Sequence, residues 1–302
     1  MGSLAELLSQ LEKIDETTLM KNDRNGGLEI AELIELISRP IDHTIVGQTG
    51  AEPDVFIEEL LEHDVSFGFD SLRSGSVGCC LVLRNREIIH SGKLSSVLTS
   101  LSYVKTKWIL IPPEIFLECS TYLEKFHDVV TIKGFESFRL LPDNTVHFSD
   151  GSPTYHWCGD GDVFPSMRES NVVNSFINEG GRSIVVIDVD VDINLGVVGR
   201  HLRSEIPITC CVVKKDQLSS GQMLCDYDGI KQVVQKSRFL RDECEGVWHP
   251  NFMVLRIELA DPTVTVPWHR MKRSSEGMLF IQYERFLADL TSSFKTEYVA
   301  LP

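Results

Sequence analysis

Short apolar runs rich in β-branched residues alternate with segments of helical periodicity along most of this chain. Between the apolar runs lie stretches with apolar residues three and four positions apart, such as 113–126 and 164–178. The runs with the length and composition of buried strands are 78–83, 108–111, 129–132, 183–190, 208–213 and 252–259. Alternation of this kind is typical of a sheet flanked by helices. The pattern therefore predicts an α/β fold with a mixed, mainly parallel sheet.

A hairpin is expected near the middle of the second half of the chain. Two apolar runs, 223–227 and 230–235, are joined by Asp228 and Gly229. Asp-Gly favours the two-residue turns that connect antiparallel strands. We therefore expect these runs to pair with each other.

The N-terminal region has a different pattern from the rest. Helical spacing is present at 4–11 and 28–37, and the second stretch ends at Arg39 because Pro40 disfavours helical geometry in the preceding residue. Residues 43–53 are rich in Gly, Thr and Pro, which is typical of a linker. The predicted organisation is an N-terminal helical segment at 1–42, a linker at 43–57 and an α/β domain at 58–302.

The loop between the two N-terminal helices, Lys21 to Glu32, matches the Ca²⁺-binding loop of EF-hands at several positions, among them Gly26 and Glu32. Its first position normally supplies a carboxylate ligand, and here it is Lys21. A cation at that position removes a ligand and repels Ca²⁺. We expect a glycine turn between two helices that binds Ca²⁺ weakly or not at all.

Charge and composition restrict the partners. The 302 residues include 44 Asp and Glu against 29 Lys and Arg, a formal net charge of −15, which argues against nucleic acid or an anionic membrane surface. No apolar run approaches the roughly 20 residues that cross a bilayer, and the N-terminus lacks the features of a secretory signal. The 8 cysteines contain no C-x-x-C spacing and are interpreted as reduced thiols. We expect a cytoplasmic protein.

The clearest chemical signal is a Gly-Asp-Gly-Asp turn at 159–162, followed by the helical stretch 164–178 and a strand that ends in Asp188, Asp190 and Asp192. Alternate residues of a strand share a face, so we expect the three carboxylates to point the same way. Ligands of open α/β sheets bind beyond the carboxyl ends of the strands. Carboxylate oxygens at such a place suit Mg²⁺. We therefore expect the turn at Gly159 and Gly161 to share one crevice with the carboxyl end of the strand 183–190, and the carboxylates of Asp190 and Asp192 to point into it.

The order of segments around this turn resembles the UDP-sugar pyrophosphorylase family, which includes UDP-glucose and UDP-N-acetylglucosamine pyrophosphorylases. After the turn and the acidic strand, Lys214 and Lys215 end the next strand. Residues 228–235 then resemble the family's D-G-x-x-Q-V-V-E hairpin, and 282–289 resemble its K-L-E-x-F-x-F-D segment. The resemblance covers the chain from about Val104 onward. It implies a nucleotide-diphospho-sugar transferase-like, Rossmann-like fold. It also implies an enzyme that joins UTP and a hexose 1-phosphate to give a UDP-sugar and pyrophosphate.

The resemblance also implies roles for individual residues. The backbone at Gly159 and Gly161 would approach the nucleotide closely, and Mg²⁺ would bind Asp190 or its rival Asp192. Either Lys214 or Lys215 would lie near the phosphates. By role, the implied residues are Lys214, Lys215 and Arg84 for catalysis; Gly75, Gly78, Gly159, Asp160 and Gly161 for the nucleotide; Asp190 or Asp192 for Mg²⁺; and Gly221 and Trp248 for the sugar.

Two departures from the family pattern support an alternative. The family has a Gly-rich loop after the first strand and then Pro-Lys, whereas the matching region 74–84 keeps Gly75 and Gly78 without Pro-Lys. The segment 239–248 carries acids where the family has sugar-binding asparagines. Nucleotidyl transfer depends on cations that stabilise spreading negative charge, so these changes weaken it. The alternative is a catalytically degenerate relative that binds UTP, a UDP-sugar or a protein partner as a regulatory module.

Overall fold

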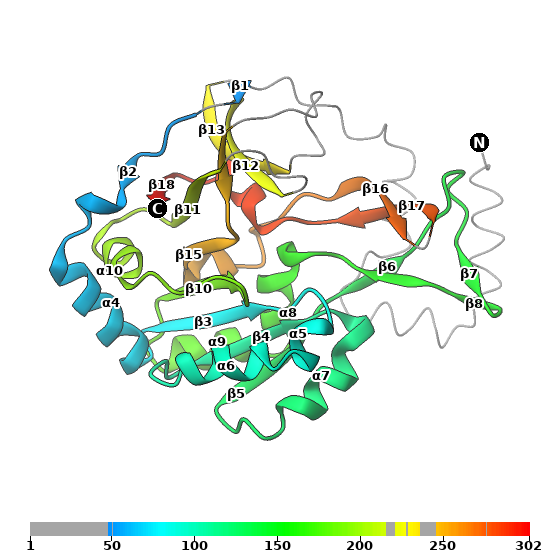
Figure 1. Ribbon diagram of the computed structural model, residues 1–302, viewed down its shortest axis with the longest axis horizontal. Coiled ribbons are helices and arrows are strands. Elements are labelled where there is room, and N and C mark those ends of the chain that lie inside the picture. The colour runs from blue at the N-terminus through cyan, green and yellow to red at the C-terminus, as the bar shows by residue number, and fades with distance from the viewer. Residues whose placement is uncertain (1–47, 50, 216–220, 228, 236–245, 276) are drawn as a thin grey trace.

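The computed structural model describes residues 48–49, 51–215, 221–227, 229–235, 246–275 and 277–302 (Figure 1). The expected N-terminal helical segment and the loop from Lys21 to Glu32 lie outside these residues, as do the acids at 242, 243 and 245. Within the described residues, no helix is both long and apolar enough to cross a membrane.

A mixed 12-stranded sheet forms the centre of the molecule (Figure 1). Its main path runs β1-β12-β14-β11-β15-β10-β3-β4-β5, and β13, β18 and β2 pair beside it. In chain order these strands are β1 (Gln48–Thr49), β2 (Val55–Phe56), β3 (Val77–Val82), β4 (Lys107–Ile111), β5 (Val129–Lys133), β10 (Ser183–Asp188), β11 (Ile208–Lys215), β12 (Gln222–Tyr227), β13 (Ile230–Gln235), β14 (Gly246–His249), β15 (Phe252–Arg256) and β18 (Thr296–Leu301).

One half of the sheet is parallel and the other is mostly antiparallel. Strands β10, β3, β4 and β5 are parallel neighbours. On the other side of β10, strand β15 runs antiparallel to both β10 and β11, and β14 runs antiparallel to β11 and β12. The α/β prediction is confirmed, but parallel strands predominate only in the first half. The expected hairpin is confirmed, because β12 and β13 pair antiparallel along their whole length.

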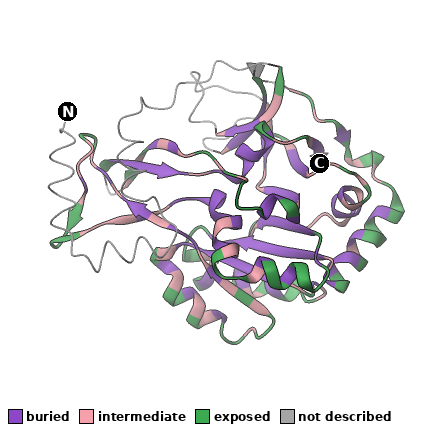
Figure 2. Cartoon of the chain, turned by 180° about the vertical axis from the view of Figure 1, so that it is seen from behind, coloured by how far each residue is buried: buried purple, intermediate pink, exposed green. Residues whose placement is uncertain are grey.

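The central strands are buried on both faces. In β3, Cys79 and Leu81 belong to one hydrophobic cluster, while Cys80 and Val82 belong to the cluster on the other face. This follows from the two-residue period of a strand. A strand that is covered on both sides needs a continuous apolar run, which explains the sequence of β3. Figure 2 shows the central strands as buried and the outer faces of the helices as exposed.

Helices supply both covering layers. Residues of α4, α5, α6, α7 and α10 belong to one cluster, and residues of α8 and α9 belong to the other. The expected single helix 164–178 is two helices, because Asn171 adopts a left-handed conformation with φ of 57° between them. The helices are α4 (Glu62–Ser74), α5 (Glu87–His90), α6 (Lys93–Ser100), α7 (Phe116–Leu123), α8 (Val163–Glu169), α9 (Val172–Asn178) and α10 (Leu195–Arg203).

Helices α4 and α10 cross in backbone contact through two glycines. A Cβ atom on Gly68 would lie 2.1 Å from the carbonyl oxygen of Leu195, and one on Gly199 would lie 2.0 Å from the carbonyl oxygen of Asp64. No side chain fits in either place, since real Cβ atoms do not approach other atoms so closely. Glycine at both positions is therefore required for the helices to pack this tightly.

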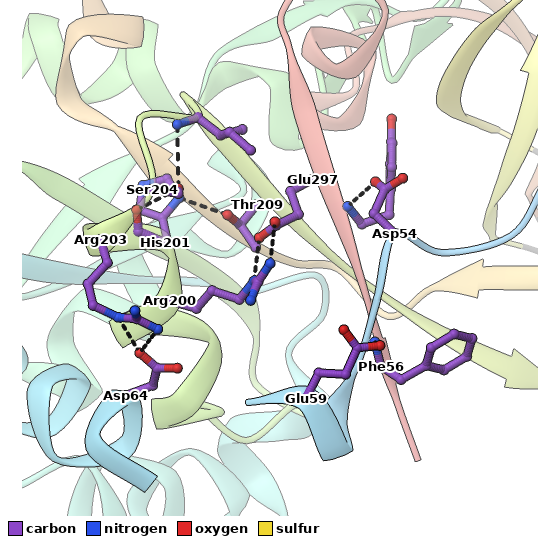
Figure 3. Close-up of polar contacts among 12 residues, drawn as sticks. Asp54, Phe56, Glu59, Asp64, Arg200, His201, Arg203, Ser204, Thr209 and Glu297 are labelled. Atoms are coloured by element: carbon purple, nitrogen blue, oxygen red, sulfur yellow. Dashed lines mark hydrogen bonds and ion pairs between the residues drawn. The ribbon is translucent and has the colours of Figure 1, made fainter. Parts of the chain in front are cut away.

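Ion pairs attach α10 to its neighbours (Figure 3). The Nε atom of Arg203 donates to the buried carboxylate of Asp64 at 2.6 Å. One turn earlier, Arg200 donates to both carboxylate oxygens of Glu297 in β18, at 2.9 and 2.8 Å. These contacts link α10 to α4 on one side and to the sheet on the other.

The remaining elements are short strands and 3-10 helices. The segment expected to be a linker instead contributes β1, which pairs with β12, and β2, which pairs with β18, so the linker prediction is wrong for residues 48–49 and 55–56. Three further two-stranded sheets project beside the main one. They comprise β6 (Glu136–Phe138) with β9 (Tyr155–Trp157), β7 (Phe148–Ser149) with β8 (Ser152–Pro153), and β16 (His269–Ser275) with β17 (Met278–Glu284). Short 3-10 helices are η1 (Ile57–Glu59), η2 (Pro113–Ile115), η3 (Asp160–Asp162), η5 (Ile257–Ala260) and η6 (Leu287–Ser292).

Candidate functional site

A crevice opens at the carboxyl ends of β3 and β10. These strands are parallel with Val82 opposite Asp188, so their ends meet at one edge of the sheet. The cavity measures about 460 Å³, which is within the range of small-molecule sites. Its lining residues are Arg84, Trp157, Gly159, Asp160, Asp188, Gly221, Gln222, Gln235, Asn251, Arg273, Glu284 and Phe286. The expectation that the turn at Gly159 shares a crevice with the carboxyl end of the strand that begins at Ser183 is confirmed.

The turn at 159–162 is held against the backbone of Arg285. The Arg285 N–H donates to the Cys158 carbonyl at 2.7 Å, and the Gly161 N–H donates to the Arg285 carbonyl at 3.0 Å. A Cβ on Gly159 would lie 2.5 Å from the Arg285 oxygen, and one on Gly161 would lie 2.5 Å from the Arg285 Cβ. The missing side chains therefore make room for the protein's own chain, which corrects the expectation that they make room for a nucleotide. Gly159 still lines the crevice.

A buried ion pair strengthens the same attachment. The Nε atom of Arg285 donates to Asp162 at 2.9 Å, and its guanidinium lies 4.1 Å from the centre of the Trp268 ring. Burial raises the pKa of Asp162 to about 6, against the opposing effect of Arg285. This carboxylate is fully buried beneath the turn and does not line the crevice.

Arg84 lines the crevice and joins two carboxylates. Its Nε atom donates to both oxygens of Asp188, at 3.0 and 2.8 Å, and its Nη2 atom donates to Asp160 at 2.9 Å. Burial disfavours the charge of Arg84, but Asp160 and Asp188 outweigh that effect and raise its pKa above the usual value. Burial raises the pKa of Asp188 as well, with Arg84 acting in the opposite direction. The predicted site residues Arg84 and Asp160 are thus both at the crevice and bound to each other.

The opposite wall carries a second ion pair. Arg273 of β16 donates from Nε to Glu284 of β17 at 2.7 Å. The two arginines and three carboxylates of the lining have a formal net charge of −1, and each takes part in an ion pair. Charge within the crevice is therefore compensated by the protein itself.

Uncharged hydrogen-bonding groups complete the lining. Gln222, Gln235 and Asn251 each present a side-chain amide, and Asn251 donates to Asp188 at 2.7 Å. The Oε1 atom of Gln222 is buried and has no hydrogen-bond partner among the described residues. A buried acceptor without a partner is costly, so such an atom indicates a place for a water molecule or a ligand hydroxyl group.

A narrow recess continues from the crevice floor toward the core. Its volume is about 10 Å³, which is room for a single water-sized group, and Gln222, Asp188 and His249 are among its lining residues. His249 lies 2.9 Å from the Cys211 carbonyl through Nδ1. Burial lowers the pKa of His249 to about 4, so the ring is neutral at pH 7.

The predicted Mg²⁺ ligands do not reach the crevice. Strand β10 ends at Asp188, and the chain then turns, so Asp190 is exposed and forms an ion pair with Lys93 of α6. Asp192 is exposed as well, and neither residue lines the crevice. Side chains alternate in direction only along a strand, so the alternation that was expected to align the three carboxylates ends with β10 at Asp188. The expectation that Asp190 and Asp192 point into the crevice is wrong.

The carboxylates that are present do not fit a magnesium ion either. Asp160 and Asp188 share the guanidinium of Arg84, which lies between them. Across the described ranges, no group of three or more His, Cys, Asp or Glu side chains could hold a metal. A divalent ion needs carboxylate oxygens that are free to bind it, and here the charge of both carboxylates is already compensated by an arginine.

Gly75 and Gly78 lie at the other end of β3. Gly75 caps the C-terminus of α4 with φ of 88°, and a Cβ on Gly78 would lie 2.1 Å from the Trp108 ring. Gly75 precedes β3 and Gly78 is its second residue, so both are at its amino end and neither lines the crevice. The segment that follows the strand is 83–86, which contains Arg84 and no glycine. The expectation that Gly75 and Gly78 form part of the nucleotide site is not met by this crevice.

The other implied residues are divided between the crevice and the core. Lys214 is exposed near the end of β11 and does not line the crevice, while the side chain of Lys215 lies outside the described part of the structure. Gly221 lines the crevice. Trp248 is fully buried, so the expected contact with a sugar is not possible in this arrangement.

Several lining residues were missed by the sequence. Asp188 is the first of the three alternating acids, and the end of the apolar run at Ile187 could have marked it as the residue at the strand's carboxyl end. Gln235 closes the hairpin motif, where the family pattern has Glu. Glu284 lies in the 282–289 segment that resembles the family, but no local signal pointed to Arg273, because the pairing of β16 with β17 brings the two residues together.

The comparisons bear on the fold. No protein-family model matches the sequence, and no curated protein matches it either. Among solved structures, a Trypanosoma brucei protein described as a UDP-glucose phosphorylase superposes with a TM-score of 0.73 at 11% identity, covering 100% of this chain and 75% of that one. UDP-glucose pyrophosphorylase from Leishmania major, solved in complex with UDP-glucose, gives a TM-score of 0.71 at 11% identity, covering 99% and 75%. This chain has the fold of the UDP-sugar pyrophosphorylases.

A third structure agrees with the other two. An Entamoeba histolytica protein described as a UDP-N-acetylglucosamine pyrophosphorylase gives a TM-score of 0.63 at 11% identity, covering 87% of this chain and 80% of its own. At this identity the likeness extends to the fold and not to individual side chains. It supports a nucleotidyltransferase-like fold for the chain.

Proposed function

We propose that the crevice at the carboxyl ends of β3 and β10 binds a uridine nucleotide, most favourably a UDP-sugar. The observation that carries this proposal is a cavity of about 460 Å³ at that edge of a pyrophosphorylase-type sheet. Ligands of open α/β sheets bind beyond the carboxyl ends of the strands. A related structure was solved in complex with UDP-glucose, which supports the same class of ligand.

The lining suits a ligand with many hydroxyl groups and little need for added cations. Gln222, Gln235 and Asn251 offer amide donors and acceptors to a ribose or a sugar. Arg84 and Arg273 are each partly exposed and carry the positive charge that a diphosphate would approach, even though both are paired with acids. In the proposed complex, amides recognise the sugar and ribose while the arginines face the phosphates.

Catalytic transfer is a more demanding function than binding. In the family reaction an oxygen of the sugar phosphate attacks the α-phosphorus of UTP. A new bond forms between this oxygen and the α-phosphorus, and the bond from the α-phosphorus to the departing pyrophosphate breaks. Negative charge spreads over the phosphates, so cations that are free to meet it dominate catalysis. The arginines of this crevice are committed to Asp160, Asp188 and Glu284.

This pairing is the reason to keep a second candidate function, which is binding without efficient transfer. Losing one such stabilising group lowers rates by about 100- to 1,000-fold. We therefore expect pyrophosphate release from UTP and glucose 1-phosphate to be at least about 100-fold slower than for an active pyrophosphorylase assayed in parallel. A coupled assay measures this rate directly. A rate close to that of the active enzyme would reject the second candidate and establish an ordinary transferase.

Isothermal titration tests the binding proposal itself. UDP-glucose, UDP-N-acetylglucosamine and UTP are titrated into the full chain, with ADP-glucose as the control for the base. Gln235→Ala should weaken UDP-glucose binding by about three- to tenfold, because it removes one hydrogen-bonding side chain. Gln232→Ala changes the same residue type on the same strand away from the crevice lining, and should leave binding unchanged. Absence of UDP-sugar binding at millimolar concentration would refute the proposal.

A further inference from the structure

The crevice contains an unusual arrangement, in which one guanidinium joins two carboxylates from separate parts of the chain. Arg84 follows β3, Asp188 ends β10, and Asp160 belongs to η3. The Nε atom of Arg84 lies 2.8 Å from one Asp188 oxygen, and its Nη2 atom lies 2.9 Å from Asp160. The cation is therefore at the point where all three segments meet.

The two carboxylates are fixed in place by further hydrogen bonds. The Leu287 N–H donates to the other oxygen of Asp160 at 3.0 Å, and the Asn251 amide donates to Asp188 at 2.7 Å. Asp160 is buried and Asp188 is largely buried. Two acids held this close in a partly desolvated place repel each other strongly unless a cation lies between them.

Two fixed carboxylates that face a common point are an arrangement that Mg²⁺ and Mn²⁺ also use. Here the point is taken by an arginine, whose planar fork matches carboxylate geometry and whose charge does not depend on binding an ion from solution. A divalent ion beside this guanidinium would meet like charge. The arginine and the metal are therefore alternatives at this place.

We propose that Arg84 is a built-in cation, which takes the place of a divalent metal ion between Asp160 and Asp188. Removal of Arg84 leaves two buried carboxylates and the Asn251 amide around an empty position, and that position becomes a divalent-cation site. This proposal concerns the protein and a metal alone. It does not depend on the ligand of the crevice, so it can stand or fail separately from the proposed function.

The experiment measures Mn²⁺ binding without nucleotide. Mn²⁺ is titrated into the full chain and followed by electron paramagnetic resonance of the free ion, for the wild type and for Arg84→Ala and Arg84→Gln. The glutamine variant keeps a donor toward the carboxylates and serves if the alanine variant does not fold. We expect Arg84→Gln and Arg84→Ala to bind Mn²⁺ at least about tenfold more tightly than the wild type, because two unpaired carboxylates are exposed to it.

Two further variants locate the gained site. Adding Asp188→Asn to Arg84→Gln should abolish the gain, since it removes one of the two carboxylates. Lys93→Gln frees Asp190 on the outer surface and should gain no Mn²⁺ binding. The proposal is overturned if the wild type binds Mn²⁺ as tightly as Arg84→Gln, if neither Arg84 variant gains binding, or if the gain persists in the double variant.

Discussion

The tight contact between the 159–162 turn and Arg285 makes a stability prediction that separates two roles for the same glycines. Gly159→Ala places a Cβ 2.5 Å from the Arg285 oxygen at a residue whose φ is +97°. Gly161→Ala creates the same kind of clash at a residue without positive φ. Gly180→Ala is the matched control, because Gly180 has φ of +88° and no atom within 4 Å of the added Cβ.

The size of each effect follows from these two terms. A non-glycine residue in a sparsely populated backbone conformation costs about 1–3 kcal/mol, and overpacking a dense site costs about 1–3 kcal/mol. Gly180→Ala carries only the first term, and Gly161→Ala carries only the second. Gly159→Ala carries both, so its free energy of unfolding should fall by about 2–6 kcal/mol.

Urea unfolding followed by tryptophan fluorescence gives the free energy of unfolding for each variant. Thermal unfolding provides a second measure, in which each 1 kcal/mol corresponds to a shift of about 2–4 °C for a domain of this size class. UDP-glucose titration is carried out on the same samples, below the temperature at which any variant begins to unfold.

Two results would refute the packing explanation. In the first, Gly159→Ala and Gly161→Ala have the wild-type free energy of unfolding, which would mean that the clash with Arg285 does not exist. In the second, both variants remain as stable as the wild type and lose UDP-glucose binding. Glycine would then be required by a ligand, as the family resemblance implied, and not by the neighbouring chain.

Three further variants test other parts of the structure. Gly199→Ala should lower the free energy of unfolding by about 1–3 kcal/mol, because the added Cβ would clash with the backbone of α4. Gly196→Ala on the same helix should be close to neutral in urea unfolding, because the nearest atom to its added Cβ is a side-chain carbon of Leu60 at 3.2 Å. Arg203→Met removes the ion-pair partner of the buried carboxylate of Asp64. It should lower the free energy of unfolding by about 3 kcal/mol, which is the lower end for a broken buried pair because the arginine is partly exposed. A decrease in the melting temperature of less than about 2 °C would contradict this. Burial lowers the pKa of His201 from 6.5 to about 3. Between these two pH values the unfolded chain takes up a proton on this ring and the folded protein does not. The free energy of unfolding therefore has its full value above pH 6.5 and falls as the pH falls toward 3. At pH 5 the loss is about 2 kcal/mol, and His201→Asn should remove it from the difference between urea unfolding at pH 7.5 and pH 5.

Local sequence determined the secondary structure and the class of the fold. The apolar run of β3 has the continuous pattern of a strand buried on both faces, and Asp-Gly marked the turn between β12 and β13. These features depend on backbone periodicity and turn chemistry, which act over a few residues. The same reasoning placed Gly159 and the end of β10 in one crevice, because the carboxyl ends of parallel strands meet at one edge.

The ends of elements were decided by tertiary contacts. Three alternating acids suggested three ligands on one face, but β10 ends at Asp188, and the turn after it carries Asp190 to the outer surface beside Lys93. The expected helix 164–178 was interrupted at Asn171, which adopts a left-handed conformation. The spacing of apolar or acidic residues can continue along the sequence beyond the end of a strand or helix. This spacing alone therefore does not show at which residue the element ends.

Which charges meet was decided by the assembled fold. Arg84 pairs with Asp160 and Asp188, which are 76 and 104 positions away in the chain, and Arg285 fills the space above Gly159 and Gly161. The sequence identified Arg84, Asp160 and both glycines as site residues, but it described each as facing a ligand. Ion pairing and steric contact act across space, with no regular relation to sequence separation. Only the tertiary structure therefore decided that these residues form ion pairs and packing contacts with other residues of the chain.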